Sequence, residues 1–188
     1  MRIGILGGTF NPPHLGHLIL AQDILGKLNL DTIFFVPTNI SPHKERDEVG
    51  SKYRLNMLAL AIEGQRQFQI KDLELRRGGV SYTVDTIHAL REEYSNDELF
   101  LIVGSDLAQD INSWKDYQGL KKNVKIVVAQ RCDTPAEKKD DFIFVDIIQI
   151  GISSSKIRKM IKKGMKIKNL VRDEVLEYIE NNNLYRKE

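Results

Sequence analysis

The stretch that decides the fold lies near the start of the chain and reads Arg2-Ile3-Gly4-Ile5-Leu6-Gly7-Gly8-Thr9-Phe10-Asn11-Pro12-Pro13-His14-Leu15-Gly16-His17. Its apolar first part predicts a short β-strand, which Gly7-Gly8 interrupts. Apolar residues then recur at helical spacing from Leu15 to Leu28. A strand that runs through glycines into a helix leaves backbone N–H groups beside the positive end of the helix dipole, where an anion binds well.

The same alternation of strand and helix continues along the rest of the chain. Further strands are expected at residues 32–36, 68–75, 99–103, 124–129 and 142–147. Helices are expected from a cap at Ser51 to about Gly64, and at 84–94, 153–163 and 172–181. This order predicts an α/β, Rossmann-like doubly wound fold with a mainly parallel sheet and helices on both faces. Ligands of such sheets bind beyond the carboxyl ends of the strands.

Length and composition limit the class of protein. The chain has 188 residues, which predicts a single domain over residues 1–188 with a helical C-terminal part from about residue 153. Hydrophobic residues make up 41% and charged residues 29%, which excludes a collagen-like chain and disfavours wholesale disorder. One cysteine, Cys132, excludes an intramolecular disulfide and fits a reducing, cytoplasmic setting. The apolar runs are too short for a signal peptide or a membrane helix.

The net charge of +2 hides an asymmetry. Residues 152–188 hold 10 Lys and Arg against 5 Asp and Glu, a balance of +5, while the rest of the chain holds 18 against 21. A basic C-terminal end can meet phosphates or nucleic acid, although a solvated helix face accounts for most of these lysines. The low total charge and the absence of aromatic residues clustered with basic ones argue against a nucleic-acid partner.

His14 and His17 lie three residues apart at the start of the first helix, so their rings share one face. The segment is neither a Walker loop nor a Gly-x-Gly-x-x-Gly dinucleotide motif, and it lacks the glutamate or cysteines of a zinc site. Taken alone, two histidines at a helix start are more often surface or capping residues. Beside the glycines, they favour binding of a nucleotide phosphate.

A second segment, Ile152-Ser153-Ser154-Ser155-Lys156-Ile157-Arg158, follows the last expected strand and opens a helix. A serine cap, exposed N–H groups of the first turn and basic side chains suit a polyphosphate. The alternative is a well-capped basic helix without a ligand. A site built from both ends of the chain is the better interpretation when the two segments are considered together.

The motifs Gly-x-Phe-x-Pro-x-His-x-Gly-His and Ile-Ser-Ser-x-x-Ile-Arg together resemble the nucleotidyltransferase superfamily. The segment Ser81-Tyr82-Thr83-Val84-Asp85-Thr86 makes the chain similar to the bacterial nicotinate mononucleotide (nicotinate-nucleotide) adenylyltransferases within it. The resemblance covers almost the whole chain. It departs at Asn11, where relatives often carry Asp, and at Ser155, where Thr is common. Asn11 keeps a polar group at this position but lacks the charge of Asp.

The resemblance implies transfer of the adenylyl group of ATP to nicotinate mononucleotide, giving nicotinate adenine dinucleotide and pyrophosphate in NAD biosynthesis. It implies Mg²⁺ carried by ATP, with no metal ligand from protein side chains. His17 and His14 would stabilise developing charge, with His17 the better candidate. The implied ATP-binding residues are Gly7, Gly8, Thr9, Phe10, Gly104, Asp106, Ser154, Ser155 and Arg158. The implied acceptor-binding residues are Asn39, His43, Lys44, Tyr82, Thr83 and Trp114.

Several alternatives stay open at this point. Asp106 also fits a helix cap, Trp114 also fits a loop anchor, and Cys132 receives no role. A related enzyme acting on nicotinamide mononucleotide or phosphopantetheine shares the first motif, as does a class I synthetase, for which 188 residues are too few. A nucleotide-binding regulator would not require His14, His17 and Arg158. Assembly into a homo-oligomer is compatible with the sequence.

Overall fold

The computed structural model describes residues 1–42, 49–130, 141–148 and 150–186. Its centre is a six-stranded, all-parallel sheet with the order β3-β2-β1-β4-β5-β6. The strands are β1 (Arg2–Gly8), β2 (Thr32–Pro37), β3 (Phe68–Ile70), β4 (Glu98–Gly104), β5 (Lys125–Gln130) and β6 (Phe142–Asp146). The chain winds outward from β1 in one direction and from β4 in the other, which confirms the predicted doubly wound α/β fold.

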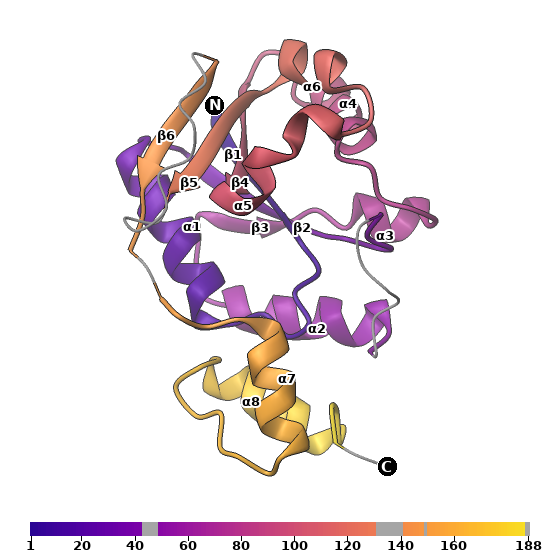
Figure 1. The fold of residues 1–188 in the computed structure, drawn as a ribbon, viewed down its shortest axis with the longest axis vertical. Coiled ribbons are helices and arrows are strands. Elements are labelled where there is room, and N and C mark those ends of the chain that lie inside the picture. The colour runs from indigo at the N-terminus through magenta and orange to yellow at the C-terminus, as the bar shows by residue number, and fades with distance from the viewer. Residues whose placement is uncertain (43–48, 131–140, 149, 187–188) are drawn as a thin grey trace.

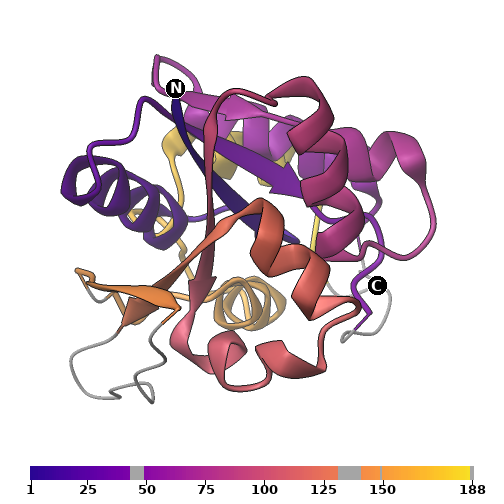
Figure 2. The ribbon, with the colours of Figure 1, turned by 90° about the horizontal axis from the view of Figure 1, so that it is seen from above.

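Helices cover both faces of the sheet (Figures 1 and 2). They are α1 (Leu15–Lys27), α2 (Ser51–Ile62), α3 (Leu73–Arg77), α4 (Thr83–Glu93), α5 (Ser105–Gln109), the 3₁₀ turn η1 (Ile111–Ser113), α6 (Tyr117–Asn123), α7 (Ser154–Lys162) and α8 (Asp173–Asn181). Along β4, Leu99 and Leu101 face the cluster formed with α4, α5 and α6, whereas Phe100 and Ile102 face the cluster formed with α1 and α2. Both faces of the sheet are therefore buried, which explains the continuous apolar runs in its strands.

A third apolar cluster joins the C-terminal helices to α2. Met57 and Ala61 of α2 pack with Ile157 of α7 and with Val175 and Ile179 of α8. In Figure 1, α7 and α8 lie beneath the sheet, beside α2. Within the described ranges, the structure contains no helix that combines the length and apolar character needed to cross a membrane.

The strand expected at residues 68–75 ends early, at Ile70. The chain instead turns into α3, where the side chains of Asp72 and Arg76 form an ion pair of 2.9 Å one helical turn apart. Gly78, with φ of 70°, ends that helix in a backbone conformation that glycine adopts easily. In this stretch, the helical ion pair and the glycine that ends the helix therefore outweigh the β-propensity of the residues.

Two further expectations need correction. The cap of α2 is Gly50 and not Ser51, which is the first helical residue. The short helices between β4 and β5 were not predicted, because each has too few residues to show a periodic pattern. Asp116 starts the last of them, where its side chain accepts a 3.0 Å hydrogen bond from the N–H of Gly119.

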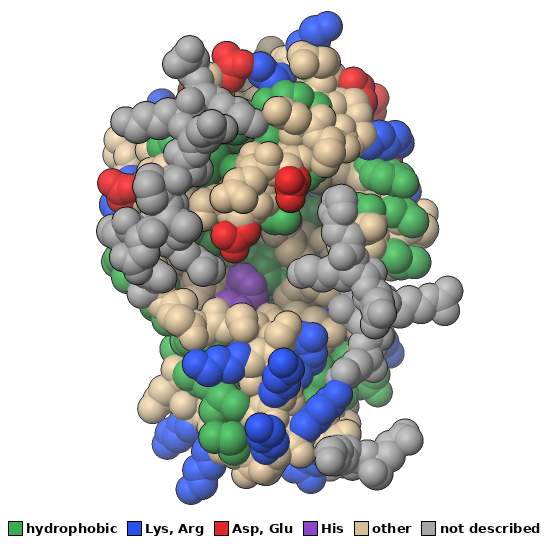
Figure 3. Space-filling model, viewed as in Figure 1, with side chains coloured by type: hydrophobic (Ala, Val, Ile, Leu, Met, Phe, Trp, Pro, Cys, Tyr) green, Lys and Arg blue, Asp and Glu red, His purple; other side chains and the backbone are tan. Residues whose placement is uncertain are grey.

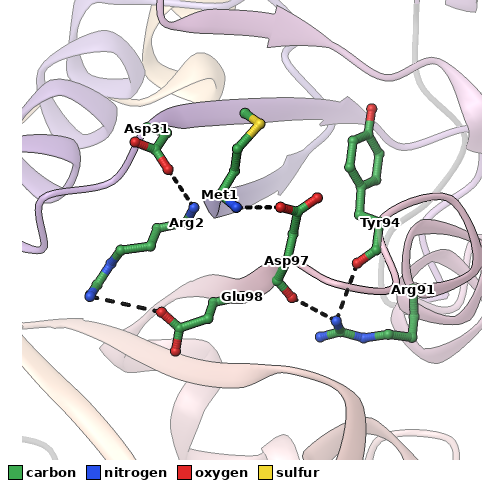
Figure 4. Close-up of polar contacts among 7 residues, drawn as sticks. All are labelled: Met1, Arg2, Asp31, Arg91, Tyr94, Asp97 and Glu98. Carbon is green, nitrogen blue, oxygen red and sulfur yellow. Dashed lines mark hydrogen bonds and ion pairs between the residues drawn. The ribbon is translucent and has the colours of Figure 1, made fainter.

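Polar contacts close the amino end of the sheet (Figure 4). The N-terminal amino group pairs with Asp97, and the N–H of Arg2 donates to Asp31 at 2.6 Å. Arg91 of α4 donates to the carbonyls of Asp97 and Tyr94, at 2.7 and 3.3 Å. These bonds fix the edge of the sheet opposite the one at which ligands of doubly wound folds bind.

Candidate active site

The loop after β1 crosses the carboxyl edge of the sheet at the point where the strand order reverses. Phe10 adopts a positive φ of 49° there, and the residue is only 2% exposed. The ring lies over Gly8, where an added Cβ would sit 3.0 Å from it, and its centroid is 5.0 Å from that of His17. The side chain of Phe10 therefore packs against Gly8 and His17, so that only the backbone of Phe10 can contact a ligand.

The two histidines form a stacked pair. Their ring centroids are 3.6 Å apart with 21° between the ring planes. A Cβ at Gly16 would lie 3.0 Å from Nδ1 of His14, so the absence of a side chain at Gly16 leaves room for the His14 ring. The backbone N–H of His14 lies 3.1 Å from Nδ1 of His17 and can only donate to it. Neutral His17 must then carry its proton on Nε2.

His14 is the buried member of the pair, at 7% exposure. Burial disfavours its charged form and lowers its pKa from 6.5 to about 4. The ring is therefore neutral at pH 7. The residue is also the N-cap of α1, so it begins the helix and lies in the candidate site at the same time.

The start of α7 is fastened directly to the loop after β1. The Ser153 side chain caps the helix by accepting from the N–H of Lys156 at 3.3 Å. The hydroxyl of Ser154 donates to the carbonyl of Pro12, and Nη1 of Arg158 donates to the carbonyl of Asn11, both at 2.8 Å. The two segments that the sequence analysis combined are thus in contact, although they lie at opposite ends of the chain.

Asn11 receives a second bond from the end of the chain. The hydroxyl of Tyr185 donates to its side-chain oxygen, and both residues are buried. The amide therefore serves as a hydrogen-bond acceptor inside the protein. This role accounts for a polar group at the position without requiring a charge.

Arg54 of α2 is a site residue that the sequence analysis missed. Its side chain is 2% exposed, and Nη1 donates to the carbonyls of Thr9 and Thr38, both at 2.8 Å. Nη2 donates to the carbonyl of Asn39 at 3.3 Å. One guanidinium thereby ties the loop after β1 to the loop after β2. The available signal was an arginine in helical phase with Met57 and Leu58, on the apolar face of its helix.

The expected acceptor side is built around the turn before α4. The N–H of Asn39 donates to Oγ of Ser81 at 3.0 Å, and its side-chain amide donates to the carbonyl of Gly79 at 2.9 Å. Tyr82 is the N-cap of α4 and Thr83 its first residue. The structure thus joins Asn39 to this turn. His43 and Lys44, also expected here, lie outside the described residues.

The remaining expected residues follow β4. Gly104 is the N-cap of α5, and Asp106 is exposed in its first turn without capping it. Trp114 is half-buried against the cluster on the α4 face, as an anchor would be. Lys115 next to it pairs with Asp85 at 3.1 Å and lies 4.5 Å from the centre of the Tyr82 ring. The Trp114 segment therefore lies beside the turn before α4.

The space-filling view shows a hollow on this face (Figure 3). A histidine side chain lies at its base, acidic side chains lie above it, and lysine and arginine side chains gather below it over α7. Among the groups at the carboxyl edge are backbone N–H groups, serine hydroxyls and the Arg158 guanidinium, which are donors that suit phosphate oxygens. Within the described ranges, no three His, Cys, Asp or Glu side chains are grouped so that they could hold a metal ion.

A Rossmann-like sheet with a glycine-histidine loop and a serine-capped basic helix at its switch point defines a nucleotidyltransferase. Residues 5–160 match the family described as cytidylyltransferase-like. The chain is 46% identical to a probable nicotinate-nucleotide adenylyltransferase of Borreliella burgdorferi, over 100% of this chain and 98% of the relative. It is 37% identical to a nicotinate-nucleotide adenylyltransferase of Bacillus subtilis, over 98% of each chain.

The fold is also similar to a solved structure of nicotinic acid mononucleotide adenylyltransferase from Plasmodium falciparum, complexed with NaAD. The TM-score is 0.81 at 24% identity, covering 98% of this chain and 97% of the other. The chain belongs to the nicotinate-nucleotide adenylyltransferase family.

The burial of His14 predicts a loss of stability in acid. Above pH 6.5 the residue is neutral in both states; as pH falls toward 4, only the unfolded chain takes up the proton. At pH 5 the loss from this residue reaches about 2 kcal/mol. Urea unfolding of wild type, His14→Asn and the exposed-site control His88→Asn at pH 7 and pH 5 checks this. His14→Asn should lose less stability on acidification than the other two; equal losses in all three would contradict the assignment.

Arg54 predicts a stability cost that charge alone does not explain. In Arg54→Lys, one ammonium on a shorter side chain replaces a fork that reaches three carbonyls, so at least one of these part-buried acceptors loses its partner. The free energy of unfolding should fall by about 1–3 kcal/mol. Chemical denaturation measures the change, with Arg66→Lys at an exposed position as the matched control. Similar values for the two variants would show that the three bonds contribute little.

Proposed function

We propose that this protein transfers the adenylyl group of ATP to nicotinate mononucleotide, forming nicotinate adenine dinucleotide and releasing pyrophosphate, a step in NAD biosynthesis. The observation that carries the proposal is the contact of the loop after β1 with the start of α7 through Ser154 and Arg158. It gathers paired imidazoles, hydroxyls, a guanidinium and a helix N-terminus at one sheet edge. The names of relatives that match the chain over its whole length support the same reaction.

The chemistry needs positioned donors and no protein nucleophile. A 5′-phosphate oxygen of nicotinate mononucleotide attacks the α-phosphorus of ATP, and the bond to the bridging oxygen breaks in line as pyrophosphate leaves. Negative charge develops on the phosphoryl oxygens during this step. The Nε2–H of His17 is assigned to that charge, because its tautomer is set by the bond from His14. The stacked His14 ring holds His17 in place.

ATP is assigned to the donors on both sides of this loop. The hydroxyl of Ser154 already donates its only hydrogen to Pro12, so Ser154 would contribute its backbone N–H, and Ser155 is the better hydroxyl donor. The bond to Asn11 uses one of the five N–H donors of Arg158. Thr9 and the glycine backbone line the path of the phosphates, and Gly104 and Asp106 would receive the ribose.

Mg²⁺ is proposed to arrive bound to the phosphates of ATP. Magnesium binds through phosphates with few protein ligands, and the donor chemistry of this edge suits the phosphate oxygens. When bound, the ion would offset negative charge on the leaving pyrophosphate. Ser155 and Arg158 would hold the phosphates to which it is bound.

The acceptor is assigned to the turn before α4. The N–H of Ser81 is used by the carbonyl of Ile40 at 2.9 Å, so the donors for a ligand begin after it, in the first turn of α4. A ring carboxylate accepts from such fixed N–H groups, whereas a carboxamide would turn its own NH₂ toward them. Tyr82 and Trp114 are proposed to face the pyridine ring, and Asn39 to fix the neighbouring loop.

The test of this function is pyrophosphate release from ATP with a panel of acceptors. Nicotinate mononucleotide should give the highest kcat/KM, exceeding nicotinamide mononucleotide by roughly 5- to 150-fold, because the amide leaves a buried donor unpaired at about 1–3 kcal/mol. Phosphopantetheine should give no release above background. A preference for phosphopantetheine would overturn the proposed function. Equal kcat/KM for the two pyridine nucleotides would overturn the assignment of carboxylate recognition to the turn before α4.

The role of His17 predicts a specific kinetic change. His17→Ala should lower kcat about 100-fold or more, the effect of removing one donor to developing charge, while the KM for ATP changes much less. His88→Ala, an exposed histidine on α4, is the matched control and should behave as wild type. An unchanged kcat in His17→Ala would refute the assignment.

A further inference from the structure

Glu74 is a buried carboxylate that the proposed chemistry does not use. It lies on α3 at 6% exposure, directly before the turn that opens α4. Its Oε1 accepts a 2.7 Å hydrogen bond from the hydroxyl of Thr86 on α4. Arg77 donates to the same hydroxyl oxygen at 3.3 Å. The carboxylate therefore connects the short helix before the turn with the helix after it.

Burial raises the pKa of Glu74, and the hydroxyls of Thr86 and Ser81 and the charge of Arg77 oppose that rise. A neutral side chain at this position would avoid the burial cost of a charge. The acidic group is thus not explained by stability alone. Its hydrogen-bond partner Thr86 follows Tyr82 and Thr83 on α4, where the acceptor is assigned.

The connection extends to the loop after β2. The hydroxyl oxygen of Ser81 accepts from the N–H of Asn39 at 3.0 Å, and the N–H of Ser81 donates to Ile40 at 2.9 Å. Between α3 and Ser81 the chain passes through Gly78 and Gly79, with φ of 70° and 66°. Two glycines supply little rigidity of their own. The direction of the turn therefore depends on the bonds that Ser81 and Thr86 make.

We propose that Glu74 is a positioning residue for substrate selection, which holds the turn before α4 so that its backbone N–H groups keep one direction toward the substituent of the pyridine ring. Fixed donors discriminate between a carboxylate and a carboxamide because they cannot rotate to suit the amide. A turn released from Glu74 adapts to either group, and the preference for the acid falls. The inference rests on the proposed function and names the residue that sets its selectivity.

The experiment compares kcat/KM for nicotinate and nicotinamide mononucleotide at saturating ATP in wild type and Glu74→Gln. The ratio of the two values should fall roughly fivefold or more in the variant, mainly through a higher KM for the acid, because loosened donors lose about 1 kcal/mol of discrimination. The KM for ATP should stay within twofold of wild type. Glu92→Gln, an exposed glutamate on α4, is the matched control and should keep the wild-type ratio.

A second variant keeps the test decisive if Glu74→Gln fails to fold. Thr86→Val keeps the branched shape and removes the hydroxyl that donates to Glu74, so it should lower the ratio in the same direction. A wild-type ratio in either folded variant would overturn the inference, even if the thermal unfolding temperature falls. An inactive wild-type protein, or one equally active on both nucleotides, would overturn the proposed selectivity itself, and the inference with it.

Discussion

The structure depends on the hydrogen bonds that the buried groups of the loop between β1 and α1 make with the rest of the chain. Asn11, Pro12 and Pro13 are buried, and buried carbonyls need partners because water cannot reach them. The partners come from the far end of the chain: Ser154 bonds to Pro12, and Arg158 and Tyr185 bond to Asn11. The same bonds bring the serine-capped helix to the switch point of the sheet. The bonds that stabilise the loop are thus the same bonds that assemble the candidate site.

Buried polar side chains fix the rest of the edge in a similar way. Arg54 joins the loops after β1 and β2 through three carbonyls, and Glu74 joins α3 to α4 through Thr86. Both are charged groups at positions where an apolar residue would be easier to bury. Neither is assigned contact with a substrate. They hold backbone groups in place, and rigid placement of backbone donors is the basis of the proposed recognition of phosphate and carboxylate.

The sequence predicted the fold class well because the signals were strong. Apolar runs of β-branched residues alternate with amphipathic helices, and glycines end β1 and β4, so the doubly wound sheet and the edge at which ligands are expected followed from pattern alone. The short helices after β4 were missed because periodicity needs more turns to appear. Arg54 was missed because a single arginine in a helix is usually exposed, and only its phase with Met57 marks it as buried.

The sequence predicted that the first loop and the start of α7 would meet, but not the hydrogen bonds that join them. The contact of the first loop with the start of α7 followed from combining two motifs. No local pattern indicated that the Ser154 hydroxyl would donate to Pro12, or that Asn39 would be tied to Ser81, since both bonds depend on the tertiary fold. The roles of His43 and Lys44 stay predictions, because they lie outside the described residues.

The fastening of the first loop by the last helices has a consequence for synthesis on the ribosome. The bonded residues are 142, 147 and 174 positions apart in sequence, so a growing chain can form these bonds only long after the first loop has been synthesised. A nascent chain that ends before α7 already carries all six strands, yet Asn11 and Pro12 still lack the side chains that bond to them. Domains form as units during translation, and incomplete ones expose apolar surface. The edge to which nucleotide binding is assigned is therefore completed only after α7 and Tyr185 have left the ribosome and docked.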